Sequence, residues 1–230
     1  LLRREIDIAA HSLKDLPSRL PEGLALGAVP VREDPRDVLI THGGRNLQTL
    51  PIGAVISTGS ERRRIQLAAM RPDIRFRDIR GNIETRILKV GSEGVDGVVL
   101  AYAGLKRLGI ESRAEQVFSS EEMLPAPCQG ALGAECRAED KHALDLLRGI
   151  ENYKIRACVD IERAFIAELG LGCHAPVAAL AVFESGNICF EGLAGGRGGE
   201  IFRSRFSVPA DRADEAALAM AAEMKKQMEI

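Results

Sequence analysis

Short apolar runs alternate with amphipathic stretches through the first half of the chain, and this alternation most constrains the fold. The strand-like runs are LALGAVP (24–30), DVLITH (37–42), AVIST (54–58), IRFRDI (74–79) and GVVLAY (97–102). Helix-like stretches such as ERRRIQLAAM (61–70) and NIETRILKV (82–90) lie between several of them. Strands that alternate with helices predict an α/β sheet flanked by helices. Ligands of such sheets bind where strand ends lead into helix N-termini.

Two proline-bearing links, VREDPRD (31–37) and LPAPCQG (124–130), flank a block of about ninety residues and suggest a hinge between two lobes. A returning strand, GALGAEC (130–136), and a helix in DKHALDLLRGI (140–150) follow the second link. If both links join the same lobes, the first lobe is discontinuous. We therefore predict domain 1 in residues 1–30 and 131–148, domain 2 in 36–124 and domain 3 in 153–230.

The last third of the chain has a different rhythm. A helix over 154–169 should end at Gly170, because glycine often stands just past a helix C-terminus. Three strand-like runs follow, with Ser185-Gly186-Asn187 as a hairpin turn, and the closing stretch 210–228 is an amphipathic helix whose Met residues should pack on the sheet. These features predict a small α+β domain.

Composition excludes several classes of protein. With 46% apolar and 28% charged residues the chain is globular rather than disordered. A net charge of -2 and 4% aromatic residues argue against a nucleic-acid binder. No apolar run approaches a membrane span and the opening is unlike a signal peptide, so we expect a cytoplasmic protein. Five cysteines without a CxxC pair indicate free thiols and no metal site.

Arginine is concentrated at two predicted strand-to-helix turns. Of the 31 basic residues 24 are Arg. Genome composition and a need to hold carboxylates explain this excess of Arg over Lys equally well. In STGSERRRIQ (57–66) the helix start favours an anion, and Ser60 can cap the helix or donate to that anion. Neighbouring helical positions differ by about 100°, so at most two of the three arginines 62–64 can face one ligand. An exposed basic first turn is the alternative.

The second arginine-bearing turn is IRGNIETR (79–86). Asn82 is a good helix cap, and Gly81 allows close approach of backbone to a ligand. Arg80 and Arg86 either face that ligand or form salt bridges in solvent. Two turns of this kind suit a ligand with several carboxylates or phosphates.

Two loops carry further candidate groups. In AHSLKDLPSRL (10–20) the carboxylate of Asp15, beside Lys14, could stabilise a positive charge on a substrate, whereas a Ser/His/Asp triad within so few residues is poorly supported. In GLGCHAP (170–176) Cys173 lies in a loop where a ligand can reach it. Three cysteines in apolar patterns should be buried packing groups: Cys136, Cys158 and Cys189. Cys128, in the second proline link, is ambiguous.

Together these motifs resemble the porphobilinogen deaminase family, also called hydroxymethylbilane synthases. The matching motifs are HSLKDLP (11–17), EDPRD (33–37), STGSERRRIQLA (57–68), RGNIETR (80–86), AGLKRLG (103–109), LPAPCQGALGAECR (124–137) and GLGCHAP (170–176). The resemblance implies a transferase of tetrapyrrole and heme biosynthesis. Its α/β fold has two lobes similar to periplasmic binding proteins, and a small α+β C-terminal domain that carries the cofactor.

The resemblance also implies the chemistry and its residues. A dipyrromethane cofactor is attached to Cys173 by a thioether, four porphobilinogens are added with loss of ammonia, and hydrolysis frees hydroxymethylbilane. Asp15 corresponds to the catalytic aspartate, which supports deamination and a cationic azafulvene-like intermediate. Cofactor contacts correspond to Cys173, Lys14, Asp15, Ser60, Arg62, Arg63, Arg80 and Gly81. Substrate contacts correspond to Arg80, Arg86, Arg107 and Gln129.

The chain departs from the family pattern in places. Gly59 stands where serine is common, Leu171 where glycine is common, and Pro127-Cys128 replace smaller residues. A further N-terminal segment is usual in the family, so we expect the first lobe to be N-terminally incomplete here. We expect a monomer that binds porphobilinogen and pyrrole-chain intermediates. A two-lobed carboxylate- or phosphate-binding module without catalysis is the alternative, although it leaves Cys173 and the third domain unexplained.

Overall fold

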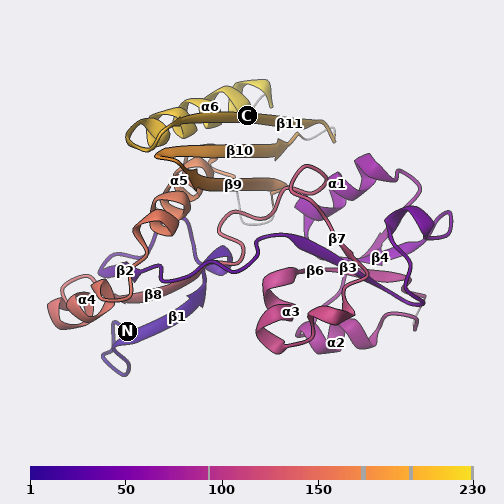
Figure 1. Ribbon diagram of the computed structural model, residues 1–230, viewed down its shortest axis with the longest axis horizontal. Helices are drawn as coiled ribbons and strands as arrows, with labels where there is room; N and C mark the ends of the chain where they lie inside the picture. Colours follow the sequence, from indigo (N-terminus) through magenta and orange to yellow (C-terminus); the bar gives the residue numbers. More distant parts are fainter. Residues whose placement is uncertain (93, 172–174, 197–198, 229–230) are drawn as a thin grey trace.

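The computed structural model describes residues 1–92, 94–171, 175–196 and 199–228, and it arranges their strands in three sheets (Figure 1). The first sheet is antiparallel in the order β1-β8-β2. Its strands come from distant parts of the chain: β1 (Ile8–Ser12), β2 (Leu24–Ala28) and β8 (Leu132–Arg137). Helix α4 (Lys141–Arg148) packs against it through Ala143 and Leu147. The short 3-10 helix η1 (Leu13–Asp15) follows β1 directly.

The second sheet has five strands in the order β5-β4-β6-β3-β7, with β4 parallel to β5 and β6, and β3 antiparallel to β6 and β7. Its strands are β3 (Asp37–Thr41), β4 (Val55–Ser57), β5 (Arg75–Arg77), β6 (Gly97–Ala101) and β7 (Gln116–Val117). Its helices are α1 (Glu61–Met70), α2 (Ile83–Leu88) and α3 (Tyr102–Leu108). Leu67 of α1 joins the apolar core on one face, while Ile87 and Leu105 of α2 and α3 join the other. Each such buried side chain contributes about 1.5–3 kcal/mol.

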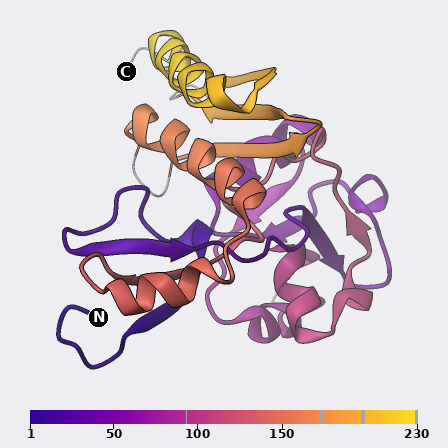
Figure 2. The ribbon, with the colours of Figure 1, turned by 60° about the vertical axis from the view of Figure 1, so that its left-hand side comes forward.

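The third sheet is an antiparallel meander, β11-β10-β9, with two helices side by side on one face (Figure 2). Its elements are α5 (Tyr153–Leu169), β9 (Val177–Glu184), β10 (Asn187–Gly195), β11 (Ile201–Pro209) and α6 (Ala213–Gln227). Ser185 and Gly186 both have positive φ (49° and 85°), which is the two-residue turn whose twist suits a β-hairpin. Met224 is buried against the sheet, as predicted.

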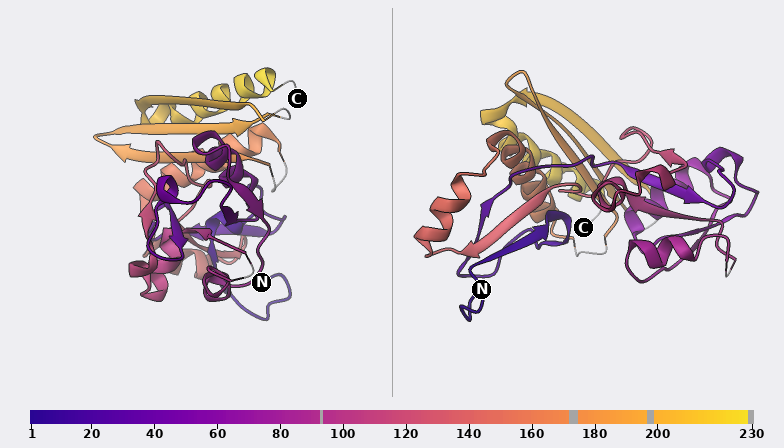
Figure 3. Two further views of the ribbon diagram at one scale, coloured as in Figure 1. Left: turned by 90° about the vertical axis from the view of Figure 1, so that its right-hand side faces the viewer. Right: turned by 60° about the horizontal axis from the view of Figure 1, so that its bottom comes forward.

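The two proline-bearing links run side by side between the first and second sheets, and we call them the first crossing (31–37) and second crossing (124–130) (Figure 3). Glu33 N donates to Gly130 O over 3.0 Å, and Arg32 forms a bridge with Ala131. A Cβ on Gly130 would lie 2.2 Å from Glu33 O, so only glycine allows this approach.

The predicted α/β architecture with a small α+β C-terminal part is confirmed. The boundaries of the three domains stay a prediction. Helix α3 was not foreseen, because GVVLAY reads as one apolar run although its strand ends at Ala101 and the helix begins at Tyr102. The burial predicted for Cys189 is wrong: it lies on the sheet face opposite the helices, half-exposed, with Sγ 3.3 Å from Ser207 Oγ. Cys128, Cys136 and Cys158 are buried.

Candidate active site

Two adjoining cavities lie where η1, α1, α3 and the second crossing meet. The first, of about 240 Å³, is called here the Ser60 pocket, and it is lined by Lys14, Asp15, Gly59, Ser60, Glu61, Arg62, Arg63, Ala126, Gln129 and Ala175. The second, of about 290 Å³, is called the Arg86 pocket, and it is lined by Ser12, Lys14, Asp15, Arg63, Ile83, Arg86, Leu100, Ala101, Ala103, Gly104, Arg107 and Gly130. Lys14, Asp15 and Arg63 line both pockets. Most of the residues predicted to act therefore gather in one region.

The loop after β1 places Lys14 and Asp15 between the two pockets. Leu13 is 1% exposed and its N–H donates to Ala131 O, which anchors η1 to the residue directly after the second crossing. Lys14 Nζ donates to Gln129 Oε1 over 3.4 Å. Surrounding protein desolvates the ammonium group, although part of the side chain stays exposed, and with the charge of Arg63 this lowers the pKa of Lys14 to about 8.

Two of the three consecutive arginines in α1 turn inward onto a single buried carboxylate. Arg62 Nη1 donates to Asp37 Oδ2 over 2.7 Å, and Arg63 Nη2 donates to Asp37 Oδ1 over 2.7 Å. Arg62 also donates to Leu124 O and Arg63 to Val99 O. Arg64 turns away to Glu61 and Asp78, in agreement with the rotation argument. The alternative, an exposed basic first turn, is wrong for Arg62 and Arg63, which are 4% and 7% exposed.

Electrostatics keeps this cluster ionised. Burial alone would raise the pKa of Asp37, but the charges and hydrogen bonds of Arg62 and Arg63 hold it well below its ordinary value. Two guanidinium groups thus share one carboxylate, and positive charge is left over at the pocket wall. Arg62 Nε and Nη2 make no hydrogen bond within the described residues, so they are available to an anion in the Ser60 pocket.

The second arginine-bearing turn is built differently. Asn82 caps α2 as predicted, because its Oδ1 accepts from Thr85 N over 2.8 Å. Arg86 Nε donates to Gly81 O and Arg86 lines the Arg86 pocket, where burial, followed by the charge of Arg63, lowers its pKa. Arg80 and Gly81 are exposed and line neither pocket. The two arginines that the sequence paired are thus separated.

The remaining predicted residues lie as follows. Arg107, from α3, lines the Arg86 pocket and donates from Nη2 to Gly130 O over 2.6 Å. Gln129 is 1% exposed and its Nε2 donates to Pro35 O and Asp37 Oδ1. Ser60 forms no capping bond with its side chain, so of its two predicted roles only donation to a ligand remains. Cys173 lies outside the described residues, although Ala175 lines the Ser60 pocket.

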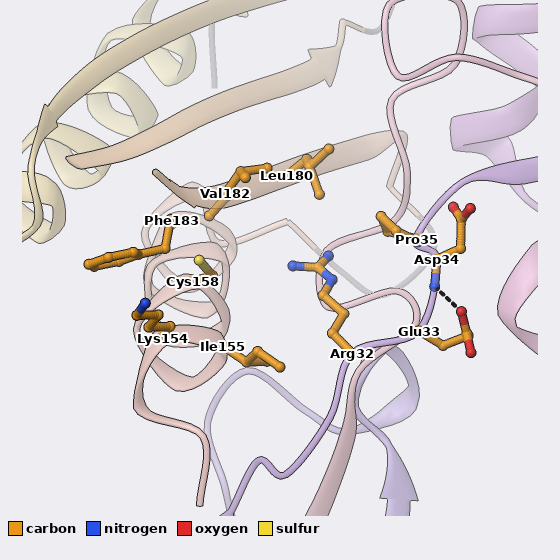
Figure 4. Close-up of a pocket in the computed structure, with 11 residues that line it drawn as sticks. Arg32, Glu33, Asp34, Pro35, Lys154, Ile155, Cys158, Leu180, Val182 and Phe183 are labelled. Atoms are coloured by element: carbon orange, nitrogen blue, oxygen red, sulfur yellow. Dashed lines mark hydrogen bonds between the residues drawn. The ribbon is translucent and has the colours of Figure 1, made fainter. Parts of the chain in front are cut away.

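A third cavity, of about 320 Å³, lies at the first crossing between α5 and β9 (Figure 4). Its Arg32 is held by Glu162, Nη1 to Oε1, over 2.6 Å. Burial raises the pKa of the Cys158 thiol beside it to about 11, so that thiol is protonated. Neither Lys14 nor Asp15 lines this cavity, and we therefore place the candidate site at the Ser60 and Arg86 pockets.

The buried partner of the two arginines, Asp37, is the residue that sequence reasoning missed. A charged residue at the start of the apolar run VLIT was the available signal, because a buried acid needs a partner. No group of three or more His, Cys, Asp or Glu side chains in the described part of the chain could hold a metal ion. No described helix combines the length and apolarity that a membrane crossing needs.

Comparison with known proteins gives the family. Residues 1–145 match the family model "Porphobilinogen deaminase, dipyromethane cofactor binding domain", and residues 156–226 match "Porphobilinogen deaminase, C-terminal domain". The chain belongs to the porphobilinogen deaminase family. Both the resemblance inferred from the motifs and the dipyrromethane cofactor are thereby confirmed, as is membership of a family of transferases.

Individual relatives agree with this assignment. The porphobilinogen deaminase of Desulforudis audaxviator is 48% identical over 213 residues, which are 92% of this chain and 69% of the relative. That of Thermus thermophilus is 44% identical over 229 residues, 99% of this chain and 76% of the relative. A solved YaeC-family lipoprotein from Enterococcus faecalis, 14% identical, covers 68% of this chain and 66% of its own with a TM-score of 0.38, which is too low to carry an argument.

Proposed function

We propose that this chain condenses four porphobilinogen units in turn, with release of ammonia, onto a dipyrromethane held by Cys173, and then hydrolyses the product to hydroxymethylbilane. The observation that carries the proposal is the position of Asp15 in both pockets among cationic side chains. Porphobilinogen carries an acetate and a propionate group, and guanidinium groups bind carboxylates well. The Arg86 pocket suits such a substrate, since four cationic side chains and one carboxylate line it.

The Ser60 pocket fits the cofactor. Lys14, Arg62 and Arg63 line it and can hold the cofactor's carboxylates, and Ser60 can donate to one of them. Ala175, two positions after Cys173 in the sequence, lies at its wall. When bound, the dipyrromethane supplies the pyrrole carbon to which the next unit is joined.

Asp15 has the catalytic role in this proposal. Positive charge develops on porphobilinogen as ammonia leaves, and a carboxylate fixed nearby stabilises that charge. Asp15 is the single carboxylate among the described residues that line the Arg86 pocket. Arg86 and Arg107 hold the substrate's carboxylates in the same pocket, and Gln129 orients Lys14. We assign no ligand contact to Arg80 or Gly81 in this conformation.

The decisive experiment is the denatured intact mass of the chain after incubation with porphobilinogen. We expect a gain equal to one dipyrromethane, lost in Cys173→Ala and kept in Cys189→Ala, because the Cys189 thiol is partly exposed but lies on the sheet face opposite the helices. A chain that stays bare would contradict the proposal. Reversible ligand binding that Cys173→Ala leaves unchanged would instead favour the two-lobed anion-binding module.

Asp15→Asn separates cofactor loading from turnover. We expect the variant to carry the dipyrromethane and to lose about 100-fold or more in turnover, since one electrostatic contact to a transition state is worth that much. Asp145→Asn, at an exposed carboxylate on α4, is the control. Undiminished turnover in Asp15→Asn would remove Asp15 from the catalytic role. The proposal also includes a monomeric state, a cytoplasmic setting and the lack of a nucleic-acid partner. Size-exclusion chromatography can test the monomeric state.

A further inference from the structure

Asp37, the first residue of β3, receives hydrogen bonds from three side chains of two different segments. Its side chain is fully buried, and its two oxygens accept from Arg62 Nη1, Arg63 Nε, Arg63 Nη2 and Gln129 Nε2 over 2.7 to 3.1 Å. Neither pocket is lined by Asp37 itself. The carboxylate therefore lies behind the pocket wall and contacts residues that form it.

We propose that Asp37 is a positioning residue for the acidic ligands of this site, and that it holds the guanidinium groups of Arg62 and Arg63 in place at the pocket wall. The inference deepens the proposed function and rests on it. Asp37 touches neither cofactor nor substrate, and it acts through the two arginines.

The hydrogen-bond pattern explains how the positioning works. Asp37 and Leu124 O bind only Nη1 of Arg62, which leaves Nε and Nη2 for a ligand. Arg63 is fixed from two sides, by Asp37 at Nε and Nη2 and by Val99 O at Nη1. An arginine that is already ordered loses little rotamer entropy when a carboxylate binds. Misplaced by about 1 Å, the same groups would bind and orient the ligand far less well.

The same carboxylate also connects the lobes. Gln129 Nε2 donates to Asp37 Oδ1 over 3.0 Å, while Gln129 Oε1 accepts from Lys14 Nζ over 3.4 Å. Lys14 belongs to the loop after β1, Gln129 to the second crossing and the two arginines to α1. The orientation of Asp37 therefore affects cationic groups of both lobes at once.

Electrostatics and positioning make opposite predictions for the loss of this charge. If Asp37 acted only as a negative charge near an anion site, removing it would strengthen the binding of carboxylates. If Asp37 holds the two arginines in place, its removal lets their side chains turn away or bind each other's carbonyl partners. The binding of carboxylates then weakens. Asp37→Asn keeps the size of the side chain and changes mainly the charge and the hydrogen-bond acceptors, so the sign of the change decides.

The test compares wild type, Asp37→Asn and Asp73→Asn with porphobilinogen as the probe. We expect KM to rise about tenfold in Asp37→Asn, with a smaller change in kcat, because the arginines hold bound substrate as well as transition state. The fraction of chains that carry the dipyrromethane, measured by intact mass, should fall as well. Asp73→Asn is the matched control, since Asp73 pairs with Arg71 in the same lobe but lines neither pocket. An unchanged or lower KM in Asp37→Asn would overturn the inference.

A second variant covers the case in which Asp37→Asn fails to fold. Asp37→Glu keeps the charge and moves the carboxylate by one methylene. A positioning role therefore predicts a raised KM, whereas a purely electrostatic role predicts an unchanged KM. A wild-type KM in folded Asp37→Glu would contradict the proposal. If the wild-type chain itself takes up no pyrrole, the proposed function fails and this inference fails with it, whereas normal wild-type uptake with unaffected variants rejects the inference alone.

Discussion

The two strand-to-helix turns of the second sheet look alike in sequence and differ in structure. Each has a polar cap residue and neighbouring arginines, Ser60 in the first and Asn82 in the second. In the first turn Arg62 and Arg63 are buried and pair with Asp37. Ser60 is the N-cap residue, but its side chain makes no capping hydrogen bond. In the second, Asn82 caps the helix and Arg80 is exposed.

The difference comes from a distant residue rather than from the turns themselves. Asp37 lies 25 residues before Arg62 in the sequence, and it is close because β3 pairs with β6 in the middle of the sheet. A buried guanidinium needs such a counter-charge, since an unpaired buried charge is very costly. Similar turns therefore yield one rigid arginine pair and one solvent-facing arginine.

The largest expected difference between the turns is in stability. Asp37→Ala should lower the free energy of unfolding by about 3–5 kcal/mol, because two buried guanidinium groups lose their counter-charge. Arg80→Ala should change it by less than about 0.5 kcal/mol, as is usual for an exposed residue. Urea unfolding of both variants measures the contrast. Equal losses in the free energy of unfolding would show that the buried ion pairs of the first turn do not stabilise the fold.

Binding should distinguish the arginines within each turn. Arg86→Gln should raise KM for porphobilinogen about tenfold, because the Arg86 pocket loses a charge-assisted hydrogen bond. Arg64→Gln should leave KM unchanged, since Arg64 lines neither pocket and pairs with Glu61 and Asp78. Steady-state kinetics checks the pair, and a larger effect for Arg64 would reverse our assignment of the pocket.

For helix capping the expected difference in stability is smaller, and here the second turn should lose more than the first. Asn82→Ala removes a cap bond to Thr85 N and should cost about 1 kcal/mol of stability. Ser60→Ala removes no cap bond and should cost only a few tenths. Thermal unfolding of the two variants tests this, with loading by dipyrromethane as a separate readout for Ser60. A larger loss for Ser60→Ala would mean that its hydroxyl stabilises the free fold.

The smallest effect concerns pH at the residue that both pockets share. With a pKa of about 8, Lys14 is cationic at pH 7 and about 90% neutral at pH 9. The affinity for a carboxylate ligand should therefore fall about threefold over this range, the scale of one solvent-accessible ion pair. In Lys14→Arg the charge persists and this part of the decline should vanish. The substrate's own titration is common to both proteins, so identical pH profiles would contradict a role for Lys14.

Local patterns predicted the elements well, and partners distant in the sequence poorly. The apolar runs located β2 to β6, and the sequence 61–70 gave the bounds of α1, because strand and helix periods are local properties. Asn82 was predicted as a cap because a cap acts within its own turn. The pairing of Arg62 and Arg63 with Asp37 was missed, because the sequence of α1 does not indicate which strand packs against it. Cys189 was placed inside because alternation in β10 shows two faces without showing which face the helices cover.

The paired crossings have a mechanical consequence. Glu33 N donates to Gly130 O at the end of the second crossing, and Gln129 Nε2 donates to Pro35 O of the first. Two segments joined in this way bend together, whereas sliding past one another would break these hydrogen bonds. Any movement of the first sheet relative to the second should therefore bend both crossings together.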